Sequence, residues 1–164
     1  MTYETGMKVL PDSAERALGS VVNKFKVCKD FGYSTYSRLD DACVSTILNY
    51  VSGIWSFKEC KAAYSIQNRA ARCFLGVHKF APILAVQGDL GWIPGTIRRK
   101  CEMIRMWNRL LNMSDNRVNK KVFLWSKLHK SPWVKEIHYI FGEADLQYEH
   151  RKSDNFNIPT QTKA

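Results

Sequence analysis

Two kinds of side chain in this sequence could do chemistry: an adjacent pair of carboxylates and a concentration of cations. Asp40 and Asp41 are of the residue type with which polymerases hold two magnesium ions. They fall in the first turns of a helix expected over 35–51, where acids interact favourably with the helix dipole. Adjacent residues on a helix point about 100° apart, which does not favour a shared ion. We therefore expect no catalytic role for this pair.

The cysteines and histidines do not suggest a metal site or a nucleophilic relay. Structural zinc requires four ligands, usually in closely spaced pairs. This chain offers one loose pair, Cys73 and His78, with Cys60 upstream. The four histidines form no cluster with a serine or cysteine that suggests a relay. We expect no metal, no cofactor and no enzymatic activity of the chain on its own. The five cysteines are expected to be free thiols packed in the core.

Basic side chains are concentrated in the middle of the sequence. Residues 58–135 hold sixteen Lys and Arg against four Asp and Glu, a net charge of +12, while the whole chain carries +10. Such a block with interspersed tryptophans is typical of a surface that meets a polyanion. The first ten residues contain no apolar signal core, and the longest uncharged run, 42–57, is too short to span a membrane. We expect an intracellular protein, nuclear or cytoplasmic, that is neither secreted nor bound to a membrane.

Helical signals dominate the elements that must position these cations. Apolar spacing and capping residues predict helices over about 12–30, 35–51, 56–76, 82–87, 94–112, 115–129 and 131–141. We predict an all-α fold of about six helices in two small groups, joined by a Gly/Pro-rich elbow between Gly76 and Gly95. The first group covers 1–76 and the second, basic group covers 77–145. Residues 146–164 are expected to be a disordered tail.

The first cationic stripe lies on the helix predicted to end at Gly76. At about 100° per residue, Lys58, Lys61, Arg69 and Arg72 fall within about 80° of one another. No acid on this helix lies at the centre of their face. Like charges at this spacing cost stability, so the stripe is either a solvated face or is compensated by an outside anion.

The second stripe lies on the helix predicted from about residue 94. Arg98, Arg105 and Arg109 share it with Glu102, which can form ion pairs at helical spacing. This stripe can therefore be a structural ladder of salt bridges. The nucleic-acid-binding residues that the two stripes and the neighbouring Arg99 predict are Lys58, Lys61, Arg69, Arg72, Arg98, Arg99, Arg105 and Arg109. Changing Arg69 and Arg72 to Gln is expected to lower affinity and to flatten its salt dependence.

Several short motifs in a fixed order resemble the region after the polymerase palm in reverse transcriptases of non-LTR retrotransposons, especially jockey-like elements. The motifs are Ala17-Leu18-Gly19, Ile47-Leu48-Asn49-Tyr50, Trp55, Asn68-Arg69-Ala70-Ala71-Arg72, Leu75-Gly76, Gly91-Trp92 with Pro94, Arg98-Arg99-Lys100 and Trp107-Asn108-Arg109-Leu110-Leu111. The resemblance covers roughly residues 10–135. It implies a thumb and C-terminal segment, which grips a template–primer duplex through its backbone.

The chain departs from the family where catalysis occurs. The aspartate-bearing fingers and palm, the endonuclease and the C-terminal Cys/His knuckle are absent. The resemblance therefore implies a non-catalytic fragment that binds the phosphates of RNA or an RNA–DNA hybrid. Two alternatives stay open: a protein-interaction module that binds a polymerase palm or itself, and a degenerate transposon remnant without selected function.

Overall fold

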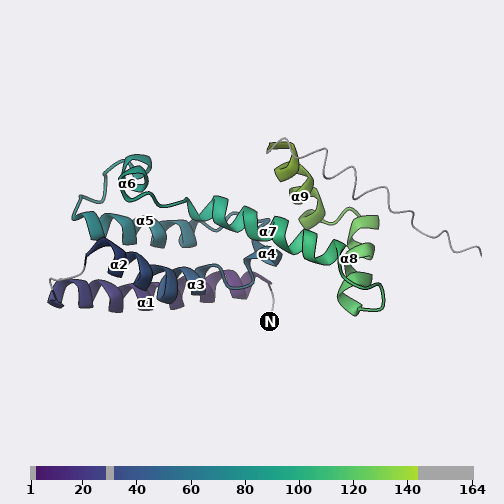
Figure 1. Cartoon of the computed structure of the whole chain (residues 1–164), viewed down its shortest axis with the longest axis horizontal. Coiled ribbons are helices and arrows are strands. Elements are labelled where there is room, and N and C mark those ends of the chain that lie inside the picture. Colours follow the sequence, from purple (N-terminus) through teal and green to yellow (C-terminus); the bar gives the residue numbers. More distant parts are fainter. Residues whose placement is uncertain (1–2, 29–31, 144–164) are drawn as a thin grey trace, which may run out of the picture. The chain divides into compact units, whose positions relative to one another are not determined.

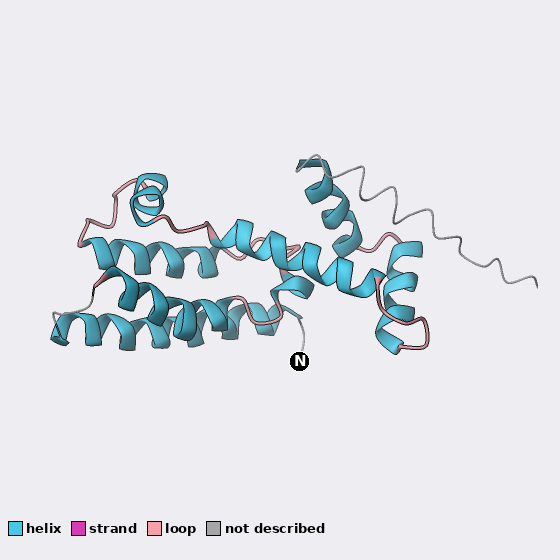
Figure 2. Ribbon diagram, viewed as in Figure 1, coloured by secondary structure: helices cyan, strands magenta, loops and turns pink. Residues whose placement is uncertain are grey.

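The structure, a computed structural model, describes residues 3–28 and 32–143. Within these residues every regular element is helical and none is a strand, so the all-α prediction is confirmed (Figure 2). The chain divides into two compact units, Met1–Glu102 and Met103–Ala164, which we call unit 1 and unit 2. The tail predicted over 146–164 lies outside the described residues.

Unit 1 is built on a long first helix. α1 (Tyr3–Cys28) packs against α5 (Lys61–Leu75) and, along the same helix, against a second set of short segments (Figure 1). These segments are α2 (Tyr33–Leu39), the π-helical turn η1 (Asp40–Ser45) and α3 (Thr46–Leu48). The core between them contains Ala14, Leu18, Val21, Tyr36, Val44, Leu48, Trp55, Ala63, Ile66 and Ala70. The helical spacing of the apolar residues in α1 and α5 therefore builds one buried core.

The helix starts differ from the sequence predictions. α1 begins at Tyr3, not at a capping box on Asp12, and Pro11 lies inside it. α5 begins at Lys61 without a side-chain cap, so the capping box predicted at Ser56 is also wrong. Both predictions relied on local motifs. A cap contributes only about 1 kcal/mol and does not by itself fix where a helix begins.

The Gly/Pro-rich elbow belongs to unit 1. Gly76 and Gly91 adopt left-handed φ angles of 66° and 62° and end α5 and α6 (Ile83–Leu90). The sequence predicts the stop at Gly76, but it ends the second of these helices at about residue 87, three residues too early. α6 packs on α5 through Val86 and Leu90. Because the elbow folds back onto α5, the division between the units falls after Glu102, inside α7 (Gly95–Leu111), and not near Gly76.

Unit 2 is organised around one tryptophan. Trp107, in the second half of α7, is fully buried. Its ring lies 4.9 Å from Phe123 of α8 (Val118–Leu128), and 5.8 and 6.2 Å from Trp133 and Phe141 of α9 (Pro132–Glu143). The Ser131 hydroxyl accepts a hydrogen bond from the Val134 amide at 3.4 Å, which confirms the predicted start of α9.

Candidate nucleic-acid interface

The arginines of α5 are engaged inside unit 1. Arg69 Nη1 donates to Glu15 Oε1 of α1 at 2.7 Å. Arg72 donates through Nε and Nη2 to the carbonyl oxygen of Ala81, at 3.3 and 3.0 Å, and so ties down the loop after α5. The expectation that this stripe lacks an acidic partner is therefore wrong, because the partner comes from a different helix.

The two lysines of the first stripe lie at the surface. Lys58 is in the turn before α5, and Lys61 is its first residue, and both are exposed. A hollow of about 260 Å³ lies nearby between α1 and α5, with Asp12, Glu15 and Arg69 among its lining residues. Two carboxylates make this hollow unsuitable for a phosphate, so any anion contact of unit 1 would have to lie outside it.

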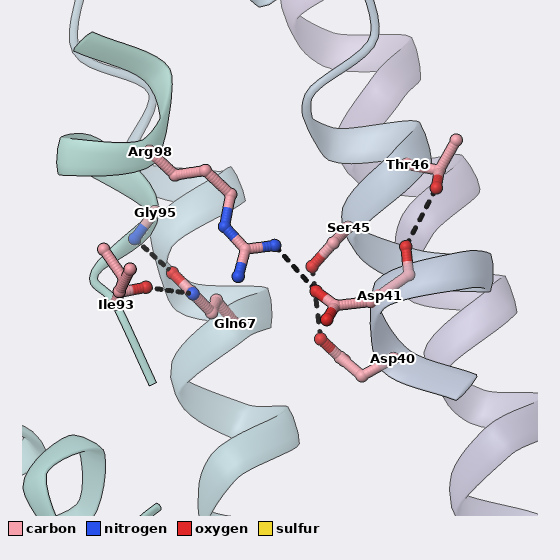
Figure 3. A network of polar contacts seen from close by, with 8 residues as sticks. All are labelled: Asp40, Asp41, Ser45, Thr46, Gln67, Ile93, Gly95 and Arg98. Carbon is pink, nitrogen blue, oxygen red and sulfur yellow. Dashed lines mark hydrogen bonds and ion pairs between the residues drawn. The ribbon is translucent and has the colours of Figure 1, made fainter. Parts of the chain in front are cut away.

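The second stripe does not form one ladder along α7. Arg98 Nη1 donates to Asp41 Oδ1 of η1 at 2.7 Å (Figure 3). Arg99 is buried, with its guanidinium carbon 6.0 Å from the centre of the Trp55 ring, and this burial lowers the pKa of Arg99. Arg105 and Arg109 are exposed on the part of α7 that belongs to unit 2.

The eight predicted residues thus fall into three groups. Arg69 and Arg98 form ion pairs whose side chains remain 48% and 36% exposed, and pairs this exposed stabilise by only about 0.2–1 kcal/mol. Arg72 and Arg99 make contacts within unit 1, and Arg72 is half-buried while Arg99 is buried. The remaining members lie at the surface and are Lys58, Lys61, Arg105 and Arg109.

The carboxylate pair takes up two different environments in the first turn of η1, which continues directly from α2. Asp40 is buried in η1 and accepts a hydrogen bond from Ser45 Oγ at 3.2 Å, while Asp41 is exposed and pairs with Arg98 (Figure 3). In this π-helical turn the Thr46 hydroxyl also donates to the Asp41 carbonyl, at 2.8 Å. This widened turn directs Asp40 inward.

Burial raises the pKa of Asp40 from 3.8 to about 6, and the Asp41 charge adds to the rise, whereas Ser45 and Arg98 oppose it. The folded state therefore holds the proton more tightly than the unfolded chain. The contribution of Asp40 to the free energy of unfolding is therefore fully present below about pH 4 and is lost as the pH rises through about 6.

Replacing Asp40 by Asn is expected to stabilise the protein by about 1–2 kcal/mol at pH 8, because the variant buries no charge. The gain is less than the full pKa shift implies, since one amide hydrogen-bonding atom stays unsatisfied. At pH 4 the variant should show no gain. Urea unfolding at both pH values measures the difference, and an equal effect at both would contradict the assignment.

A glutamine in α5 holds the chain before α7 in place. Gln67 Nε2 donates to the Ile93 carbonyl at 3.1 Å, and Gln67 Oε1 accepts from the Gly95 amide at 2.7 Å (Figure 3). A Cβ at Gly95 would lie 2.5 Å from this oxygen, so any other residue there would displace the Gln67 amide from its hydrogen bonds. Sequence reasoning did not single out Gln67, because its partners are backbone atoms in a distant loop.

The cysteines depart in part from the expected core positions. Cys60 is buried and Cys73 is half-buried, but Cys28, Cys43 and Cys101 are exposed, so the core prediction is wrong for these three. Within the described ranges, no three His, Cys, Asp or Glu side chains are grouped to hold a metal ion.

Trp125 is the tryptophan whose side chain is exposed to solvent. It is 59% exposed on α8, whereas Trp55 and Trp107 are buried. The signal for it was present in the sequence. α8 carries apolar residues around most of its circumference, and a helix that packs on one side must leave some of them outside.

Comparison with family models, with curated proteins and with solved structures finds no match to this chain. None of the helices in the described ranges combines the length and the apolar character needed to cross a membrane.

Proposed function

We propose that this chain is a non-catalytic nucleic-acid-binding fragment that contacts phosphates of RNA or an RNA–DNA hybrid, as the resemblance to a reverse transcriptase thumb implies. The observation that supports the proposal best is the charge of unit 2. Its described residues, 103–143, hold eight Lys and Arg against three Asp and Glu. The exposed cations among them are Arg105, Arg109, Arg117, Lys121, Lys130 and Lys135.

The buried lysine of unit 2 has a structural role instead. Lys120 Nζ donates to the carbonyls of Leu110 and Leu111, at 3.1 and 2.6 Å, and so caps the C-terminus of α7. From Asn116 to Lys135 the sequence contains six basic residues and no acid. No carboxylate within this segment can therefore neutralise its cations, and an outside polyanion reduces their mutual repulsion.

In unit 1 we assign phosphate contacts to Lys58 and Lys61. The ion-paired Arg69 and Arg98 can change partners at low cost, since exposed pairs are weak. Arg72 and Arg99 are assigned structural roles. Contacts between these cations and phosphates depend on the nucleic-acid backbone and are largely independent of the base sequence.

A salt titration tests the proposal. Filter binding of the full chain to duplex RNA, an RNA–DNA hybrid and a single strand should give affinities that fall linearly with salt on logarithmic axes, with a slope of roughly 0.7–0.9 for each phosphate contact. Affinity that is absent, or that does not change with salt, would contradict it.

A protein-interaction role is the second candidate, because α8 exposes a set of large apolar side chains. These are Val118, Val122, Leu124, Trp125 and Leu128, each at least 44% exposed. Self-association through this face would persist at high salt, whereas phosphate binding would fade. Sedimentation of the full chain at low and high salt separates the two functions.

A further inference from the structure

The exposed face of α8 presents an aromatic pair. The rings of Trp125 and His129 are stacked with their centres 4.3 Å apart and their planes 28° from parallel. His129 Nδ1 lies 2.9 Å from the Trp125 carbonyl oxygen, and this contact fixes the imidazole beside the indole. Both side chains are exposed. An indole held in one orientation at the surface loses little rotamer freedom when a planar ligand stacks on it.

Cations lie in line with this pair. Lys121, Trp125 and His129 follow one another at four-residue spacing and so form one ridge along the helix. Arg117, at the N-cap of α8, precedes this ridge by a further four residues, and Lys130 follows it with a left-handed φ of 46°. All five side chains are exposed, so the ridge combines a polyanion contact with an aromatic surface.

The position of Lys121 decides which partner this face fits. At about 100° per residue it lies within about 40° of Trp125 and about 20° of Leu128, in the middle of the apolar stripe. An apolar partner helix that covered the stripe would bury this ammonium group, which costs several kcal/mol without a paired charge. A nucleic-acid strand places a phosphate there and a base beside the indole. This combination of cations and aromatic rings is how proteins bind unpaired bases.

We propose that Trp125, supported by His129 and flanked by Lys121, is a stacking platform for an unpaired base of single-stranded RNA. This inference rests on the proposed phosphate-binding function and names its ligand more narrowly: a strand with unstacked bases. Every base has a π-face, so the platform would be tolerant of sequence.

The test compares two ligands that differ only in their bases. The full chain is titrated with a single-stranded oligonucleotide of about 12 nucleotides and with an abasic phosphodiester chain of the same length and charge. The platform predicts that the base-bearing strand binds roughly 5- to 150-fold more tightly, and that it quenches tryptophan fluorescence. Trp125→Ala should remove this preference and leave the affinity for the abasic chain unchanged.

Leu124→Ala is the matched control, because it removes an exposed apolar side chain from the same helix about 100° away from the indole. It should keep the preference. Equal affinity of the wild type for both ligands, or a preference that survives Trp125→Ala, would overturn the platform while phosphate binding stands. Loss of self-association in both variants, with no preference for bases, would overturn the platform and assign the face to a second copy. Failure to bind these two ligands, together with the duplex RNA and the hybrid of the salt titration, would overturn the proposed function as well.

Discussion

Replacing Trp107 by alanine is expected to unfold unit 2. The side chain is fully buried and its ring contacts Phe123, Trp133 and Phe141, so the truncation leaves a large cavity. Substitutions of this kind cost about 3–5 kcal/mol. At about 0.05–0.15 kcal/mol per residue, a unit of this size holds stability of the same order. Peptide-resolved hydrogen exchange should show lost protection over α8 and α9.

Trp125→Ala is the control for this prediction. It makes the same truncation in the same unit at a side chain that is 59% exposed, and it should change stability by less than about 0.5 kcal/mol. The helices α1 and α5 of unit 1 should keep their protection in both variants. Similar losses from the two substitutions would mean that Trp107 does not organise unit 2.

Replacing Gln67 by methionine is expected to destabilise unit 1 by about 2–3 kcal/mol. Methionine has a similar volume, but its side chain neither donates to the Ile93 carbonyl nor accepts from the Gly95 amide. Both backbone groups would lose their partner, and the penalty for an unsatisfied buried polar group applies. Urea unfolding followed by circular dichroism measures the loss.

The corresponding control is Gln87→Met. Gln87 is also buried in unit 1, but its Nε2 donates to one side chain, Asn68 Oδ1, at 3.2 Å. This substitution should cost less, because it removes one hydrogen bond to a side chain, whereas Gln67→Met removes two hydrogen bonds to the backbone. If Gln87→Met lowered the free energy of unfolding more than Gln67→Met does, the hydrogen bonds of Gln67 to the chain before α7 would not be the stronger link.

Local signals in the sequence predicted the parts of the fold that depend on nearby residues. The glycine stop at Gly76 and the serine cap at Ser131 are confirmed, because each acts through backbone geometry within one turn. The predicted helix over 35–51 ends instead at Leu48, and Val51 adopts a φ of 53°. A β-branched residue rarely takes this conformation, so no local pattern indicated the break.

The candidate site was predicted less well, because its electrostatics depend on distant partners. Arg69 pairs with an acid 54 residues away and Arg98 with one 57 residues away. A helical wheel compares residues on one helix only and cannot detect such pairs. Arg99 shows the same limit: it lies on a predicted basic segment, yet it is buried under Trp55. Arg105 and Arg109, in contrast, are exposed on α7.

The most direct test of the central claim compares two triple variants with equal loss of charge. Arg105, Arg109 and Lys121 are changed to Gln in one, and the exposed cations Lys24, Lys26 and Arg38 of unit 1 in the other. We predict that the first variant lowers the slope of affinity against salt by about 2–3 on logarithmic axes, while the second keeps the slope of the wild type. Equal slopes in the two variants would contradict the claim that cations of unit 2 contact phosphates.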